Sequence, residues 1–187
     1  MVRRVSPLGP ADYAIMGLLR ERARHGYELA EAFHPGGDLA VVCGMPRNVL
    51  YAQVHRLERF QFVSGTLEQV GEIRQRMILR LTPAGETVFL EWLDQPVDRM
   101  REVRQDFLLK LYFSRRSVTH DTASLLDRQI ARCDEYLAER VRERRRLTAG
   151  SFDELLSQMR VSGARATLDW LREYRAEVAA LPVSTRS

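Results

Sequence analysis

The segment 47–60 contains several side chains that can form hydrogen bonds or ion pairs with a charged partner. At about 100° per residue, one side of a helix over this segment carries Leu50, Val54 and Leu57. The opposite side carries Asn48, Ala52, His55 and Arg59, with Tyr51 and Arg56 beside them. The spacing therefore predicts an amphipathic helix with one packing face and one polar, aromatic and basic face.

The polar face has the chemistry needed to read a nucleic-acid duplex. The major groove of B-DNA is about 12 Å wide and admits one helix, whose outward side chains reach base edges. Arg47 is placed to meet a phosphate or guanine, and Asn48 has the amide that reads adenine. His55 could contact a base or a phosphate, and the Tyr51 hydroxyl could donate to the backbone. Ala52 would allow close approach, and Arg56, beside this face, is also expected to contact DNA.

The same pattern also has a purely structural interpretation. A helix face rich in arginine is most often only a solvated face, and Tyr51 could pack against Tyr27. Winged helices also serve as protein–protein modules that do not touch DNA. The surrounding elements therefore decide how the face is interpreted.

Those elements are short helices followed by a hairpin. Helical periodicity covers residues 13–22 and 27–33, and alternating patterns over 62–67 and 77–82 predict two strands. Thr82-Pro83 is a typical helix start. The order helix, helix, helix, strand, strand, helix predicts a winged helix-turn-helix, in a mainly α (α+β) chain. Arg74 and Arg76, on the descending edge of the hairpin, would lie along the minor groove or its phosphates.

The second half is predicted to be all helical. Long amphipathic patterns run over residues 121–146 and 152–181, and Pro96 marks a bend between the halves. Long helices with one apolar face cannot bury those faces alone in so small a unit. Because these faces need a partner, which a second copy of the chain would supply, we expect residues 96–187 to form a helical domain for dimerisation and ligand sensing. Residues 1–95 would form the DNA-binding domain.

Composition sets the class of protein. The 187 residues are 45% hydrophobic and 29% charged, with a net charge of +4. Residues 1–95 carry 11 Arg and 11 Asp or Glu, so the excess lies in the other half. No apolar run approaches the roughly 20 residues of a membrane span, which predicts a soluble, cytoplasmic protein. Cys43 and Cys133 are 90 residues apart and fit small buried residues better than a redox pair.

No motif indicates an enzyme. The phosphate-loop pattern GxxxxGK[ST], the nucleophile elbow GxSxG and the zinc motif HExxH are absent from the sequence. The four histidines are scattered, and adjacent carboxylates such as Asp134-Glu135 diverge on a helix. We expect no catalytic residue, no cofactor and no metal.

Several motifs together resemble the PadR family of bacterial transcriptional regulators. YAIMGLL at 13–19 and HGYEL at 25–29 are similar to its opening. VLYAQVHRLE at 49–58 is similar to its recognition helix, and RLTPAGE at 80–86 to the junction after its wing. DFLLKLYF at 106–113 resembles the start of the helical domain in its longer subfamily.

The resemblance implies a homodimer that binds an inverted-repeat operator, commonly as a repressor that a small molecule releases. It places Tyr51 at the DNA-facing tyrosine of the family and Arg74 and Arg76 in its basic wing. Met45-Pro46-Arg47 before the helix departs from the family pattern, as do the segment 34–44 and the acidic Glu68 and Glu72 of the wing.

Two questions stay open at the level of sequence. Aromatic residues could line an effector cavity, but aromatic side chains at helical spacing are more often core, so no ligand residue is assigned. These residues are Trp92, Phe107, Tyr112, Tyr136 and Trp170. The alternative function is a winged-helix adaptor for a protein partner, which the neutral charge of residues 1–95 keeps open.

Overall fold

A computed structural model of the chain describes residues 8–70, 74–117 and 119–180, apart from the side chains of residues 70, 74 and 75. The contacts divide the chain into two units. The first unit consists of the chain up to Asp94 together with Arg104–Phe113. The second consists of Gln95–Val103 and the chain from Ser114 onward. The assignment of DNA binding and dimerisation to separate parts of the chain stays a prediction.

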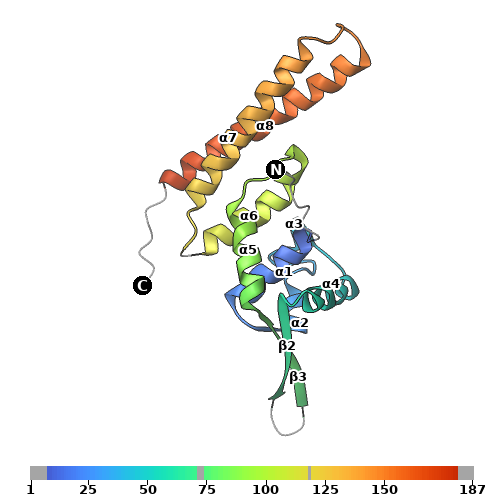
Figure 1. The fold of residues 1–187 in the computed structure, drawn as a ribbon, viewed down its shortest axis with the longest axis vertical. Helices are drawn as coiled ribbons and strands as arrows, with labels where there is room; N and C mark the ends of the chain where they lie inside the picture. Colours follow the sequence, from blue (N-terminus) through green and yellow to red (C-terminus); the bar gives the residue numbers. More distant parts are fainter. Residues whose placement is uncertain (1–7, 71–73, 118, 181–187) are drawn as a thin grey trace. The chain divides into compact units, whose positions relative to one another are not determined.

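The first unit is a winged helix. Its elements are α1 (Pro10–Glu21), β1 (Arg24–His25), α2 (Gly26–Glu31), α3 (Ala40–Cys43), α4 (Arg47–Arg59), β2 (Val63–Val70), β3 (Arg74–Leu81) and α5 (Pro83–Asp94). The strands form an antiparallel sheet in the order β1-β3-β2, with Val63 opposite Leu81 and Leu67 opposite Met77. In Figure 1, β2 and β3 extend away from the helices as a long hairpin. The expected fold is confirmed.

Local chemistry explains where these helices begin. Pro10 occupies the first turn of α1, where its missing N–H costs nothing, and the Asp12 carboxylate accepts the Gly9 N–H at 2.7 Å. Thr82 precedes α5, and its hydroxyl accepts the Gly85 N–H at 3.1 Å. The start of α5 therefore lies where the Thr-Pro pair predicts it.

The core of the first unit lies under α1, which buries eight consecutive residues from Asp12 to Leu19. A Cβ built on Gly17 would come 2.5 Å from Cε1 of Phe113, so the glycine admits this ring. Phe113 also meets Phe89 edge-on, with ring centroids 5.5 Å apart. Phe113 belongs to α6 (Asp106–Arg116), so a helix from beyond residue 95 helps to complete this core.

The only lysine of the chain is buried against the same helix. Lys110, on α6, is 2% exposed, and its ammonium lies 4.2 Å from the centroid of the Trp92 ring. The ammonium also donates to the Trp92 carbonyl. Trp92 in turn stacks on Tyr13, with ring centroids 4.4 Å apart. A cation–π contact and a hydrogen bond thus accompany the burial of this charge.

The second unit is built on a pair of long helices, α7 (Thr122–Arg144) and α8 (Phe152–Ala180). Asp121 caps α7 by accepting the Ala123 N–H at 2.9 Å. The buried Gln129 holds both backbone groups of Val97, accepting its N–H at 2.8 Å and donating to its carbonyl at 3.1 Å. This side chain fixes the backbone at Val97 against α7.

α8 has apolar residues on two opposite faces. One face packs in the second unit and buries Val161, Leu168 and Leu171. The other remains exposed at helical spacing and consists of Phe152, Leu155, Met159 and Trp170. Leu155 and Met159 of this face are 58% and 65% exposed.

The structure adds elements that periodicity did not indicate. The segment 34–44, for which no helix or strand was predicted, contains the short helix α3, and two residues after α1 pair with β3 as β1. The hairpin strands extend beyond the expected strands, to Val70 and from Arg74. A short 3-10 helix, η1 (Met100–Arg104), precedes α6.

Candidate nucleic-acid interface

α4 presents the two faces that its sequence predicts. Leu50, Val54 and Leu57 are buried in the first unit. The opposite face is exposed and carries four of the expected residues, which are Asn48, Tyr51, Ala52 and His55. The helix therefore displays an amide, a phenol, a methyl group and an imidazole to solvent on one side.

Arg47, the first residue of α4, is exposed and held by α2. Its guanidinium lies 5.0 Å from the centroid of the Tyr27 ring and 3.6 Å from a carboxylate oxygen of Glu31. Both contacts are to side chains that are themselves exposed. Such contacts aim the guanidinium but leave its outward donors available.

Tyr51 lies directly over the start of α2. A Cβ built on Gly26 would come 2.9 Å from Cε1 of Tyr51 and 3.1 Å from its hydroxyl oxygen. Tyr51 as a whole is 38% exposed, so it packs against α2 while part of it stays accessible to solvent. The expected packing of Tyr51 in this direction and its expected exposure are therefore compatible.

His55 and Tyr51 border a groove between α4 and the sheet. The groove has a volume of about 730 Å³, and its walls include Tyr27, Tyr51, His55, Glu58 and Arg76. Nδ1 of His55 lies 3.0 Å from a carboxylate oxygen of Glu58, which orients the imidazole. The groove thus brings the outward face of α4 and Arg76 of β3 together.

Arg56 lies elsewhere. Its guanidinium pairs with Asp12 of α1, whose side chain is fully buried, and only 31% of the Arg56 side chain is exposed. Asp12 also binds the Gly9 N–H, so this pair connects α4 to the start of α1. The structure thus gives Arg56 a role in the fold. Its expected contact with DNA stays a prediction, and Arg56 is not part of the surface proposed below.

Of the two wing arginines expected to contact DNA, Arg74 and Arg76, the structure describes the side chain of Arg76. Arg76 on β3 is exposed and lies opposite Glu68 in the register of the sheet. Glu68 is engaged by another residue, because Arg80 donates to it at 2.7 Å. The side chain of Arg74 lies outside the part of the chain that the structure describes.

Two residues of this surface were missed from the sequence as site residues. Tyr27, 60% exposed, lies against Arg47, and Gly26 gives Tyr51 its room. The signal was present in the HGYEL run, which places a glycine and an exposed aromatic residue at the start of a helix.

The described residues provide no group of three or more His, Cys, Asp or Glu side chains that could hold a metal ion. In the same part of the chain, no helix is both long and apolar enough to cross a membrane.

Comparison with known proteins gives two kinds of match. The family model "Virulence activator alpha C-term" matches residues 103–179. Among curated proteins there is no significant match. The solved structures that the chain is similar to over most of its length include those of PadR and PadR-like transcriptional regulators.

Three of these structures illustrate the similarity. Bacillus subtilis PadR in complex with operator DNA is 21% identical, with 92% of this chain and 99% of that chain covered and a TM-score of 0.47. The same PadR in complex with p-coumaric acid is 20% identical, with 91% and 99% covered and a TM-score of 0.42. A PadR-like transcriptional regulator from Bacillus cereus is 18% identical, with 94% and 99% covered and a TM-score of 0.44.

Proposed function

We propose that this protein is a cytoplasmic, sequence-specific DNA-binding transcriptional regulator of the PadR type. The observation that carries the proposal is the outward face of α4, where Asn48, Tyr51, Ala52 and His55 are exposed together. A helix of this kind fits the major groove, and these side chains have donors and acceptors for base edges. The resemblance of residues 49–58 to the PadR recognition helix supports the same assignment.

The proposed DNA surface combines reading and anchoring residues. Asn48 and Tyr51 would meet base edges or the adjacent backbone, whereas Arg47 and Arg76 would meet phosphates. Residues 1–95 carry as many acidic as basic residues, so affinity would depend on where these arginines point. Arg74 would extend the basic edge of the wing.

We also propose that the protein acts as a homodimer through its helical part. The exposed apolar face of α8 supports this, because Phe152, Leu155, Met159 and Trp170 recur at the spacing of a helix–helix seam. A two-fold dimer would place two α4 helices on successive major grooves, about 34 Å apart, and its operator would be an inverted repeat.

The regulatory mechanism would be a shift between two dimer arrangements. A small molecule that binds one arrangement more tightly changes the spacing of the two α4 helices and so changes operator affinity. As a repressor, the protein would block transcription until this molecule releases it from DNA. The resemblance of the chain's motifs to those of the PadR family implies ligand control of this kind.

The test is fluorescence anisotropy with the duplex upstream of the protein's own gene and a scrambled duplex, at two salt concentrations. We expect a preference of about a thousandfold, with affinity that falls as salt rises. The Asn48→Ala/Tyr51→Ala double variant should lose the preference, and Gln158→Ala, an exposed change on α8, should keep it.

The alternative is a winged-helix adaptor that binds a protein. Equal, weak binding to both duplexes by a dimeric protein would contradict operator recognition at this promoter. A genome-wide pull-down of bound DNA would then decide, because an adaptor would enrich no sequence and a regulator would enrich its operators.

A further inference from the structure

The hairpin that extends away from the helices (Figure 1) carries two exposed apolar side chains with no role in the core. Leu67 on β2 and Met77 on β3 lie directly opposite each other in the register of the sheet, so they share one face of the hairpin. They are 63% and 47% exposed. A single exposed apolar residue is ordinary, whereas this pair forms a small apolar surface.

This surface continues outward from the buried core. Side chains two residues apart share a face of a strand, and Leu79, two residues after Met77, is buried. β1 pairs with β3 at Ile78 and Leu79, so Met77 lies just beyond that pairing. Glu68 and Arg80 belong to the other face, where Arg80 donates to Glu68 at 2.7 Å. The hairpin therefore has an apolar face and a face that carries paired charges.

Gly65 leaves room for Met77 beside α4. A Cβ built on Gly65 would come 2.7 Å from Sδ of Met77 and 2.9 Å from a carboxylate oxygen of Glu58 on α4. Met77 also lines the groove that Tyr51 and His55 border. The apolar face of the hairpin is thus continuous with the face of α4 that is proposed to read DNA.

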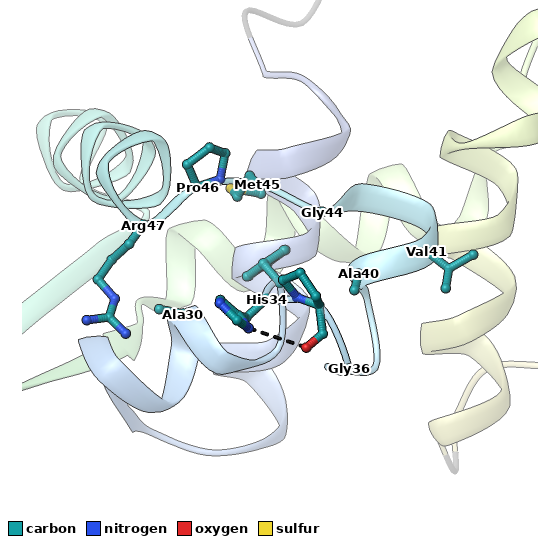
Figure 2. A pocket seen from close by; sticks show the side chains of 11 residues that line it. Ala30, His34, Gly36, Ala40, Val41, Gly44, Met45, Pro46 and Arg47 are labelled. Carbon is teal, nitrogen blue, oxygen red and sulfur yellow. Dashed lines mark hydrogen bonds between the residues drawn. The ribbon is translucent and has the colours of Figure 1, made fainter.

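α4 borders a second hollow, on the side of α2 and α3. Its volume is about 610 Å³, and its lining, in the described part of the chain, comes from residues 30–47. Figure 2 shows this hollow, with Met45 and Pro46 in the segment that leads into α4. The groove shared by Met77 and Tyr51 is therefore the one that joins α4 to the hairpin.

The size and the setting of the apolar pair favour DNA over a protein partner. Two side chains offer far less than the roughly 800 Å² per partner that a stable protein interface buries. A minor groove, in contrast, accepts single Leu or Met side chains. Arg76, which precedes Met77, lines the same groove of the protein and supplies a positive charge for a phosphate. With α4 in the major groove, a hairpin at its side reaches the neighbouring minor groove.

We propose that Leu67 and Met77 enter the minor groove next to the segment that α4 reads, and that they select A·T over G·C pairs there. A G·C pair projects the guanine N2 amino group into the minor groove, whereas an A·T pair has no donor in that place. An apolar side chain would leave this amino group without a hydrogen-bond partner. The two residues thereby add sequence preference at positions that α4 does not touch. The inference rests on the proposed DNA-binding function.

Base analogues test the inference with the wild-type protein. Hydroxyl-radical footprinting of the full chain on the duplex upstream of its own gene locates the protected minor-groove positions. These positions are then made A·T, G·C or inosine·C, because inosine·C matches G·C in the major groove but lacks the minor-groove amino group. We expect the A·T and inosine·C duplexes to bind about tenfold more tightly than the G·C duplex. An inosine·C duplex that binds like the G·C duplex would overturn the inference.

Variants test whether these two side chains are responsible. Leu67→Thr and Met77→Thr, made together, remove the apolar surface and keep a residue type that suits a strand. Val41→Thr makes the same kind of change at an exposed position of α3 and is the matched control. We expect the double variant to bind the A·T and G·C duplexes within about twofold of each other, and the control to keep the wild-type difference. Circular dichroism checks that both variants keep the wild-type fold.

The outcomes separate this inference from the function on which it rests. A double variant that keeps the wild-type preference for A·T would show that another group reads the minor groove, and the inference would be wrong. A double variant with altered sedimentation and an unchanged preference would show that the pair is a contact between copies of the chain. A wild-type protein that prefers the operator to a scrambled duplex, but binds the A·T, inosine·C and G·C duplexes equally, would refute the inference alone. The absence of any operator preference would refute the proposed function as well.

Discussion

Gly26 and Tyr51 occupy complementary space, since a Cβ on the glycine would lie 2.9 Å from the tyrosine ring. The ring therefore holds its place over α2 only because residue 26 has no side chain. We expect Gly26→Ala to displace the ring and to weaken operator binding severalfold to tenfold, with the thermal unfolding temperature little changed. Anisotropy titration and circular dichroism measure the two quantities.

A double-mutant cycle separates this effect from a general disturbance. If Gly26 acts through the ring, Gly26→Ala should have no further effect on affinity in a Tyr51→Ala background. The same loss in both backgrounds would mean that the glycine matters for another reason.

Substitutions of Asn48 and Arg76 should change DNA binding in different ways as well as by different amounts. Asn48→Ala is expected to cost about 1–3 kcal/mol at the operator and to relax the sequence preference, because its amide would read a base. Arg76→Gln should weaken operator and scrambled duplexes alike and reduce the salt slope by about one. Arg160→Gln, an exposed arginine of α8, is the control for net charge. A change of sequence preference in Arg76→Gln would contradict this division.

Asp12 and Arg56 should matter for stability. Removing one partner of a buried ion pair costs about 3–5 kcal/mol, and the partial exposure of Arg56 favours the lower end. We expect Asp12→Asn to lower the free energy of unfolding in urea accordingly. Asp134→Asn breaks the exposed pair with Arg172 and should cost less than about 1 kcal/mol. Similar losses in both variants would show that burial is not decisive here.

The faces of α4 and the hairpin could be predicted because each depends on local periodicity. Leu50, Val54 and Leu57 define the buried side of α4, and the exposed residues follow from the helix geometry. The alternation over residues 77–82 likewise predicted β3, in which Leu79 is buried although Met77 is 47% exposed. The winged helix thus follows from patterns a few residues long.

Contacts between distant residues could not be predicted in this way. Arg56 lies at the border of the two faces of α4, and its partner Asp12 is 44 residues away. β1 has two residues and α3 has four, too few to show a period.

The exposed face of α8 predicts the oligomeric state. Leu155→Asp places a charge in the proposed seam and should convert the dimer to a monomer in sedimentation or light-scattering measurements. Gln158→Asp adds the same charge on an exposed position at a different angle around the helix and should leave the dimer intact. A wild-type monomer, or a Leu155→Asp dimer of unchanged affinity, would contradict the proposed interface.

The two thiols should be inert in the folded protein. Burial raises the pKa of Cys43 and Cys133, so both remain protonated at neutral pH and out of reach of reagents. The stability that comes from a raised pKa is fully present below the ordinary thiol value of 9.0 and is lost as the pH rises from there through the higher pKa of the folded protein. Ellman's reagent should therefore detect no thiol at neutral pH before denaturation and two afterwards. Rapid reaction of either thiol in the native protein would indicate a redox role.

α6 has a consequence for how this chain can be divided or recombined. Phe113 fills the space over Gly17, and Lys110 contacts Trp92. The core of the winged helix is therefore completed by side chains of α6, which follows it in the sequence. A fragment cut after Asp94 would lack these side chains and expose the rings that they cover. A chimaera that joins this winged helix to another ligand-binding domain should therefore keep the present sequence as far as Phe113.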